Sequence, residues 1–337
     1  MSRDRPISAA RACATGALTL LVLLSACSRA VKPARTSFTQ PVFEAEIEAA
    51  GRVAASRCSD AWSLVLPGVG QMCRHKTVEG SALLVAGAVE LGTGIAVGER
   101  QPDGYAHPGA SVPLVAFQDL WIYANTEPLI ERALARRALY TPQESLADML
   151  AAPFNLQVMK RPEVWAGTLG LLALGIGATW LLDGRYINTD DAFGAPRLFG
   201  ENFDRATGYP LGIGVGVGLF GHVAVAEEVL FRGAMQSGLS RRYGPFQGWL
   251  WSSLAFGLSH SLNVFTMQDS ERTRYLLYAV PFITGVGSYL GFAYHKSEYS
   301  LSVPIAIHFW YDLLLSTTFF AIDPKNSPIS ASISLTF

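Results

Sequence analysis

The hydrophobic residues of this chain gather into long runs, without the alternation of apolar and polar positions that marks a half-buried strand. A helix needs about 20 apolar residues to cross ~30 Å of hydrocarbon. Five runs approach this length, at residues 164–182, 211–230, 246–262, 276–294 and 303–322. We expect each of them to form a helix that crosses a membrane.

Two further runs come before these five, and the second of them is weaker. Residues 82–97 follow a glycine-rich segment, residues 66–71, which resembles the Pro-Gly-x-Gly-Gln hairpins of small bacterial membrane domains; such glycines permit close helix packing. Residues 112–125 are interrupted by Gln118 and Asp119. We therefore predict an all-α, multi-pass transmembrane bundle of about seven or eight membrane helices.

The composition favours lipid as the surrounding solvent. Only 16% of the 337 residues are Asp, Glu, Lys or Arg, against about 25% in ordinary soluble domains. Hydrophobic residues make up 50%, and the mean hydropathy is +0.26. The formal net charge is -1, and no basic tract has the pattern that follows a phosphate backbone. Nucleic acid is therefore excluded as an expected partner.

The first 27 residues have the layout of a secretory signal. Arg3, Arg5 and Arg11 form a basic start, an apolar run covers residues 14–24, and small residues precede Cys27. This end resembles a bacterial lipobox, in which the cysteine is lipidated and becomes the mature N-terminus. The alternative is an uncleaved anchor helix. The four cysteines show no CxxC pair and no zinc spacing, so no disulfide framework is expected.

Basic residues in the short loops predict the orientation, because Lys and Arg collect on the cytoplasmic side. The loop with Arg74, His75 and Lys76 is expected inside the cell, whereas residues 183–209 are richer in acid and face outward. Residues 131–161 are also expected inside, since they contain Arg132, Arg136, Arg137, Lys160 and Arg161. The predicted location is the bacterial inner membrane.

These patterns divide the chain into six parts. They are a signal peptide with lipobox or an anchor (1–27), a polar extracytoplasmic lead-in (28–60), an N-terminal membrane hairpin region (61–130), a cytoplasmic linker (131–162), a helical core (163–322) and a C-terminal tail (323–337).

Charged residues interrupt the run that begins at residue 211. It contains Glu227 and Glu228, and Arg232 follows directly. One charge at the centre of a membrane helix costs about 2.5 to 3.5 kcal/mol, so these groups must be paired or line a polar cavity. Glu228 and Arg232 are four residues apart and can form a pair on one helical face. Glu227 lies about 100° away, free to face a neighbouring helix. His222 is expected to face packing or a polar cavity.

Two later runs contribute histidines at the same spacing. Phe256 and His260 are four residues apart, and so are His308 and Asp312. Side chains four residues apart on a helix project toward the same neighbour. A lone intramembrane histidine is more often a packing residue. Three runs that each offer acid or imidazole to a common interior indicate a functional site.

The ordered patterns Glu-Glu-x-x-x-Arg, Phe-x-x-x-His and His-x-x-x-Asn/Asp resemble the signature of the CAAX-processing and bacteriocin-processing (CPBP) intramembrane protease family. The resemblance covers residues from about 164 to 321, nearly half of the chain. It implies an all-helical membrane fold in which these residues surround a water-containing cavity. The implied activity is hydrolysis of a peptide bond in a peptide or membrane-associated protein.

The resemblance also implies a role for each residue. Glu227 is the general base, His260 positions the attacking water, His308 and Asp312 stabilise the oxyanion, and Glu228, Arg232 and Phe256 support them. Family members that process prenylated proteins generally have Asn where this chain has Asp312. An amide can donate a hydrogen bond to an oxyanion, whereas an ionised carboxylate only accepts. Asp312 must therefore be protonated, orient His308 or bind a metal.

The need for a cofactor stays open at this point. Glu227, His260, His308 and Asp312 form a plausible zinc-ligand set. The resemblance equally supports a glutamate mechanism without metal. The expected cofactor is therefore either none or a divalent metal such as zinc.

Two other functions also place polar residues inside a membrane bundle. A non-catalytic scaffold or immunity protein uses them to hold helices together, at about 0.6 kcal/mol per contact. A proton-coupled transporter uses them as a relay. The expected partners are a peptide or membrane-protein substrate and membrane lipid.

Overall fold

The computed structural model describes residues 60–98, 108–142, 144–183, 189–199, 201–267 and 269–325. The expected signal, its Cys27 and nearly all of the lead-in lie outside these residues, as does most of the C-terminal tail. The described residues are mostly helical, and their only strands pair as one antiparallel hairpin, β1 (Arg197–Leu198) with β2 (Glu201–Asn202).

The helices alternate between long elements and short connectors. The long ones are α4 (Thr77–Gly98), α5 (Pro108–Ala135), α8 (Pro162–Asp183), α9 (Arg205–Glu228), α11 (Pro245–His260), α13 (Val280–Lys296) and α14 (Ser302–Ile322). The short ones are η2 (Asp60–Leu64), α3 (Val69–Cys73), α6 (Leu146–Ala151), η3 (Ala152–Phe154), α7 (Leu156–Met159), α10 (Ser237–Tyr243), η6 (Ser261–Thr266) and α12 (Asp269–Arg274). Two π-helical segments in the described residues, η5 (Val229–Gln236) and η7 (Tyr275–Ala279), continue α9 and precede α13.

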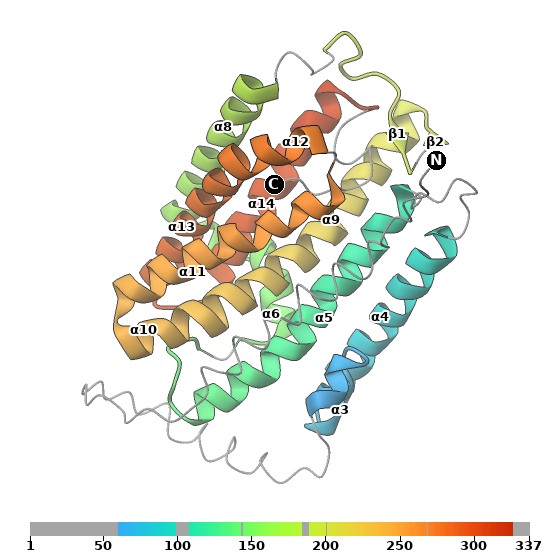
Figure 1. Ribbon diagram of the computed structural model, residues 1–337. Coiled ribbons are helices and arrows are strands. Elements are labelled where there is room, and N and C mark those ends of the chain that lie inside the picture. Colours follow the sequence, from blue (N-terminus) through green and yellow to red (C-terminus); the bar gives the residue numbers. More distant parts are fainter. Residues whose placement is uncertain are drawn as a thin grey trace, which may run out of the picture.

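The long helices lie side by side, with α9 inside the bundle (Figure 1). α9 packs between α5 and α14, α4 packs on α5, and α8 packs on α13 and α14. One buried apolar cluster joins α5, α9 and α14, and a second joins α11, α13 and α14. The helices that carry the three motifs meet between these clusters.

Each predicted run falls on a helix, and a membrane protein built of helices is confirmed. Within the described residues, four helices are long and apolar enough to cross a membrane: Thr77–Val97, Arg205–Tyr243, Asp269–Lys296 and Ser302–Ile322. The helix α11 has only 16 residues, which corresponds to about 24 Å. The number of seven or eight membrane helices therefore stays a prediction.

The helix α9 has a defined start and an unusual continuation. The Asp204 side chain accepts a hydrogen bond from the backbone N–H of Thr207 at 3.0 Å, which caps the helix. Hydrogen bonds from Thr207 lower the pKa of Asp204. At its other end α9 passes directly into the π-helix η5. Such π segments are rare and often lie at functional sites, and this one follows Glu227 and Glu228.

The glycine-rich segment at residues 66–71 brings α3 close to α4. Gly68 has a φ of 88°, a left-handed conformation that glycine adopts readily. A Cβ added at Gly68 would lie 2.1 Å from the Gly80 carbonyl oxygen. Gln71 is fully buried, and its amide donates to the Ala124 carbonyl at 3.0 Å. The segment therefore serves close packing of the N-terminal helices.

A cluster of ion pairs lies where α3, α4 and α5 meet. Arg74 lies 2.5 Å from Glu127 and also pairs with Glu131, and Lys76 pairs with both carboxylates. Burial by itself lowers the pKa of Lys76, but Glu127 and Glu131 outweigh this effect and the pKa is raised. The loop that begins α4 is thereby fixed to the last turns of α5.

Two connections bring other basic segments together. Arg241, at the end of α10, donates to the Arg137 carbonyl at 3.2 Å, and Lys296, at the end of α13, lies 4.0 Å from Glu163.

Cys73 is disulfide-bonded, against the expectation from the cysteine spacing. Because disulfides are rare in the cytosol, Cys73 does not fit a cytoplasmic loop. The orientation stays a prediction.

Candidate active site

Glu228 and Arg232 form the predicted pair at the junction of α9 and η5. Both side chains are completely buried, and Arg232 Nη1 donates to Glu228 Oε1 at 3.0 Å. Arg232 Nη2 donates to the Gly287 carbonyl at 2.9 Å, on α13. A buried charge is tolerated when it is paired and hydrogen-bonded, as both groups are here. The pair also ties the end of α9 to α13.

His308 connects this pair to α14. Its Nδ1 lies 2.9 Å from Glu228 Oε1, and its Nε2 lies 3.2 Å from Asp312 Oδ2. An ionised carboxylate only accepts hydrogen bonds. A His308 ring that bonds both carboxylates therefore donates from both nitrogens.

Glu227 lies between the two histidines of the motifs. Its Oε1 is 3.8 Å from His260 Nε2, and its Oε2 is 3.8 Å from His308 Nε2. These separations are longer than a direct hydrogen bond of about 2.7 to 3.2 Å. Oε2 is buried and has no hydrogen-bond partner among the described residues. Side chains from α11 and α14 thus converge on one carboxylate of α9.

The exposure of the two neighbouring glutamates differs. The Glu227 side chain is 20% exposed and that of His260 is 16% exposed, whereas the Glu228 side chain is 0% exposed. Glu227 and His260 are therefore partly accessible from outside the protein, and Glu228 is not. This difference separates a carboxylate that can contact water from one that holds other side chains.

Phe256 supports both histidines. Its carbonyl accepts a hydrogen bond from His260 Nδ1 at 2.8 Å, so His260 Nε2 is left facing Glu227. Its ring lies 4.4 Å from the Arg232 guanidinium carbon, at cation–π distance, and edge-on to His308. His260 is the last residue of α11, because the chain tightens into η6 at Ser261.

The close approach of α13 to α11 and η5 depends on glycine. A Cβ added at Gly287 would lie 2.7 Å from Phe256 Cδ1. One turn further, Gln236 Nε2 donates to the Gly291 carbonyl at 2.8 Å. Neither η5 nor these contacts were predicted. Two glycines four residues apart are the signal that could have indicated a close helix contact.

Asp119 is a buried carboxylate that sequence reasoning did not assign to the site. It is 4% exposed, and its Oδ2 has no hydrogen-bond partner among the described residues. Asp119 lies close enough to Glu227, Glu90 and His308 to interact with them electrostatically. In the sequence, Asp119 interrupts a weak apolar run. A carboxylate inside a membrane segment is itself a signal of a functional site.

His222 faces a polar partner, which is one of the two surroundings expected for it. Its Nε2 lies 3.3 Å from Glu90 Oε1 on α4, and its Nδ1 lies 2.8 Å from the Gly218 carbonyl. The pair bridges α4 to α9. It lies outside the group formed by Glu227, His260 and His308.

The site residues do not fit the zinc set considered from the sequence. In the part of the chain that the structure describes, no group of three or more His, Cys, Asp or Glu side chains is arranged to hold a metal ion. Zinc needs ligand atoms at about 2.0 to 2.2 Å. Both ring nitrogens of His308 instead face carboxylates, those of Glu228 and Asp312.

In this helical bundle a glutamate and two histidines meet between the helices. The fold and the site are therefore those of a membrane protein with a polar site inside its bundle. Residues 210–314 match the model of a family described as type II CAAX prenyl endopeptidase, Rce1-like. No curated protein and no solved structure matches the chain. The matched stretch runs from within α9 into α14 and contains all three motifs. This part of the chain is therefore similar to the Rce1-like family, which confirms the resemblance recognised from the sequence.

Proposed function

We propose that the protein is an intramembrane endopeptidase that hydrolyses a peptide bond of a peptide or membrane-associated protein. The family match supports a protease. The observation that carries the proposal is the placement of Glu227, a partly accessible carboxylate with His260 Nε2 and His308 Nε2 each 3.8 Å away.

Glu227 acts as the general base. A carboxylate without a close partner has a lone pair for the proton of a water molecule. Because His260 Nδ1 donates to the Phe256 carbonyl, His260 Nε2 presents a lone pair to the second hydrogen of the same water. The water oxygen then adds to the peptide carbonyl carbon, and Glu227 keeps the proton.

His308 stabilises the oxyanion that this addition creates. A ring that donates to both Glu228 and Asp312 carries a positive charge beside the reacting carbonyl, where it favours the developing negative charge. Asp312 then orients His308, which is one of the three roles open to it from the sequence. The proton on Glu227 passes to the leaving nitrogen as the C–N bond breaks.

The variant Glu227→Gln tests this assignment. Glutamine is nearly isosteric but cannot take a proton, so cleavage should be abolished while the amount of protein in the membrane stays normal. The matched control is Glu90→Gln, which removes a carboxylate on α4 outside the site and should leave cleavage intact. The measurement compares new peptide termini, by mass spectrometry, in membranes of cells that express each variant or the wild type.

Termini that need the wild type and disappear with Glu227→Gln would identify the substrate. If Glu227→Gln produces the same termini as the wild type, Glu227 is not the base and the proposal fails. A scaffold or immunity protein would produce no such termini in any variant. A transporter would lose proton-coupled flux without a change in cleavage.

A further inference from the structure

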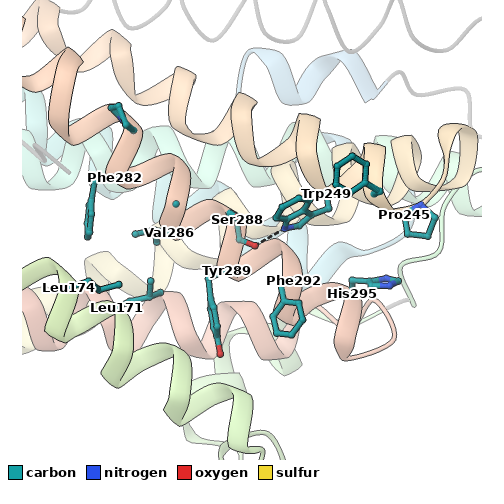
Figure 2. A pocket seen from close by; sticks show the side chains of 13 residues that line it. Leu171, Leu174, Pro245, Trp249, Phe282, Val286, Ser288, Tyr289, Phe292 and His295 are labelled. Carbon is teal, nitrogen blue, oxygen red and sulfur yellow. Dashed lines mark hydrogen bonds between the residues drawn. The ribbon is translucent and has the colours of Figure 1, made fainter.

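A long groove lies on the face formed by α8, α11 and α13, with a volume of about 870 Å³. None of the proposed catalytic residues lines it. Figure 2 shows Leu171, Leu174 and Phe282 toward one end and Pro245, Phe292 and His295 toward the other. The groove is therefore a feature separate from the site at Glu227.

The walls of the groove present hydrocarbon, because their main polar atoms are already bonded. Trp249 Nε1 donates to the Ser288 carbonyl at 2.8 Å, as Figure 2 shows, and the Tyr289 hydroxyl donates to the Glu163 carbonyl at 2.7 Å. A peptide lying in the groove would find few partners for its backbone N–H and C=O groups, and unsatisfied backbone groups are strongly disfavoured inside a membrane. A hydrocarbon chain has no such requirement.

One end of the groove is basic. His295 lines it at the end of α13, and the adjacent Lys296 is 51% exposed, with its Nζ 5.9 Å from the Phe292 ring. Arg241 and Arg242 occupy the last turn of α10, shortly before Pro245 at the same end. An apolar groove that ends among basic side chains complements a hydrocarbon chain with an anionic head.

We propose that the groove binds an acyl chain of an anionic phospholipid, with the lipid phosphate at His295 and Lys296. Basic pockets between membrane helices bind anionic head groups, and each Lys or Arg near a membrane surface strengthens such binding about fivefold. The binding is independent of the proposed peptidase activity.

Gly285 provides a way to fill the groove. It lines the groove on α13, and a Cβ added there would meet nothing within 4 Å. The variant Gly285→Leu therefore occupies the groove without a clash at its Cβ. Gly214 on α9 has equally open surroundings and does not line the groove, so Gly214→Leu is the matched control.

Trp249 serves as the reporter, because bromine on a lipid chain quenches a tryptophan that it contacts. The full-length protein is reconstituted in phosphatidylcholine vesicles that contain either brominated phosphatidylglycerol or brominated phosphatidylcholine. The difference between the wild type and Trp249→Phe isolates the signal of Trp249. We expect stronger quenching by the brominated phosphatidylglycerol in the wild type and in Gly214→Leu. Gly285→Leu should abolish this preference, and Lys296→Gln should reduce it about fivefold.

Equal quenching of Trp249 by the two brominated lipids in the wild type would overturn the anionic-lipid assignment. An unchanged preference in Gly285→Leu would place the lipid outside the groove and also overturn the proposal. Glu227→Gln should bind lipid as the wild type does. A failed peptidase assay would therefore not count against lipid binding in the groove. Equally, a failed lipid-binding test would not count against the proposed peptidase activity.

Discussion

Glu228 accepts two hydrogen bonds on one oxygen, from Arg232 at 3.0 Å and from His308 at 2.9 Å. The spacing of residues along one helix predicts the first bond, because Glu228 and Arg232 are four residues apart. It cannot predict the second, because His308 comes from another helix. Glu228 is therefore the point at which the guanidinium of η5 and the imidazole of α14 are held together.

The variant Arg232→Ala should lower the stability of the protein. It leaves a completely buried carboxylate without its cation, and breaking a buried pair in this way typically costs about 3 to 5 kcal/mol. The expected result is less folded protein in the membrane and a lower Tm in detergent, with loss of cleavage as a consequence.

The control for this prediction is Asp269→Ala, which breaks the exposed pair of Asp269 with Arg272. An exposed pair contributes about 1 kcal/mol or less, so this variant should behave like the wild type. Equal melting temperatures of the Arg232 and Asp269 variants would contradict a structural role for the buried pair.

At the scale of elements, the contact between α11 and α13 leaves no space for a side chain at Gly287. The variant Gly287→Ala places a Cβ 2.7 Å from the Phe256 ring, so Phe256 must move, together with its cation–π contact to Arg232. Overpacking of this kind typically costs about 1 to 3 kcal/mol. A lower Tm and weaker cleavage are expected, and both are measurable on the purified protein.

Gly285→Ala is the matched control, two residues earlier on the same helix. The space around Gly285 is open, and alanine is favoured over glycine in a helix interior by about 1 kcal/mol. This variant should be as stable as the wild type or more so. If the two alanine variants melt at the same temperature, the close packing at Gly287 does not limit stability.

The helices could be predicted from the sequence because each is a long apolar run. The exact bounds of the helices and their departures from regular α-helix could not be predicted. The interrupted run at residues 112–125 is part of the longer α5, which continues through Pro113 and Pro128. The π-helix η5 has no signature in the pattern of hydrophobic residues. The surroundings of the site follow the same division. The motifs indicated Glu227, His260 and His308, whereas the position of Asp119, and of the Glu90–His222 pair outside the site, depends on how α4 and α5 pack against α9.

At the scale of the whole molecule, basic loops from distant parts of the sequence gather at one end of the bundle. Arg241 contacts the Arg137 carbonyl, and Lys296 lies 4.0 Å from Glu163. The positive-inside rule places this end in the cytoplasm. The disulfide at Cys73 is typical of the opposite compartment.

Labelling with a membrane-impermeant maleimide resolves this conflict. Arg136 and Ala192 are both exposed, the first after α5 and the second before β1. With the basic end in the cytoplasm, Ala192→Cys should be labelled in intact cells, whereas Arg136→Cys should be labelled only after lysis. The unsubstituted chain provides the background from the native cysteines. The reverse pattern would invert the predicted orientation and account for the disulfide.

The short length of α11 has a consequence for the lipid around the protein. At 16 residues, or about 24 Å, the helix falls short of a hydrocarbon layer of ~30 Å. A helix shorter than the bilayer is accommodated by local thinning of the membrane. Because α11 ends at His260, the thinned region would bring head groups and their hydration water toward the side of the bundle on which Glu227 meets His260. Hydrophobic mismatch would thus shorten the path that a water molecule travels to the proposed base, and a thicker bilayer should slow its supply.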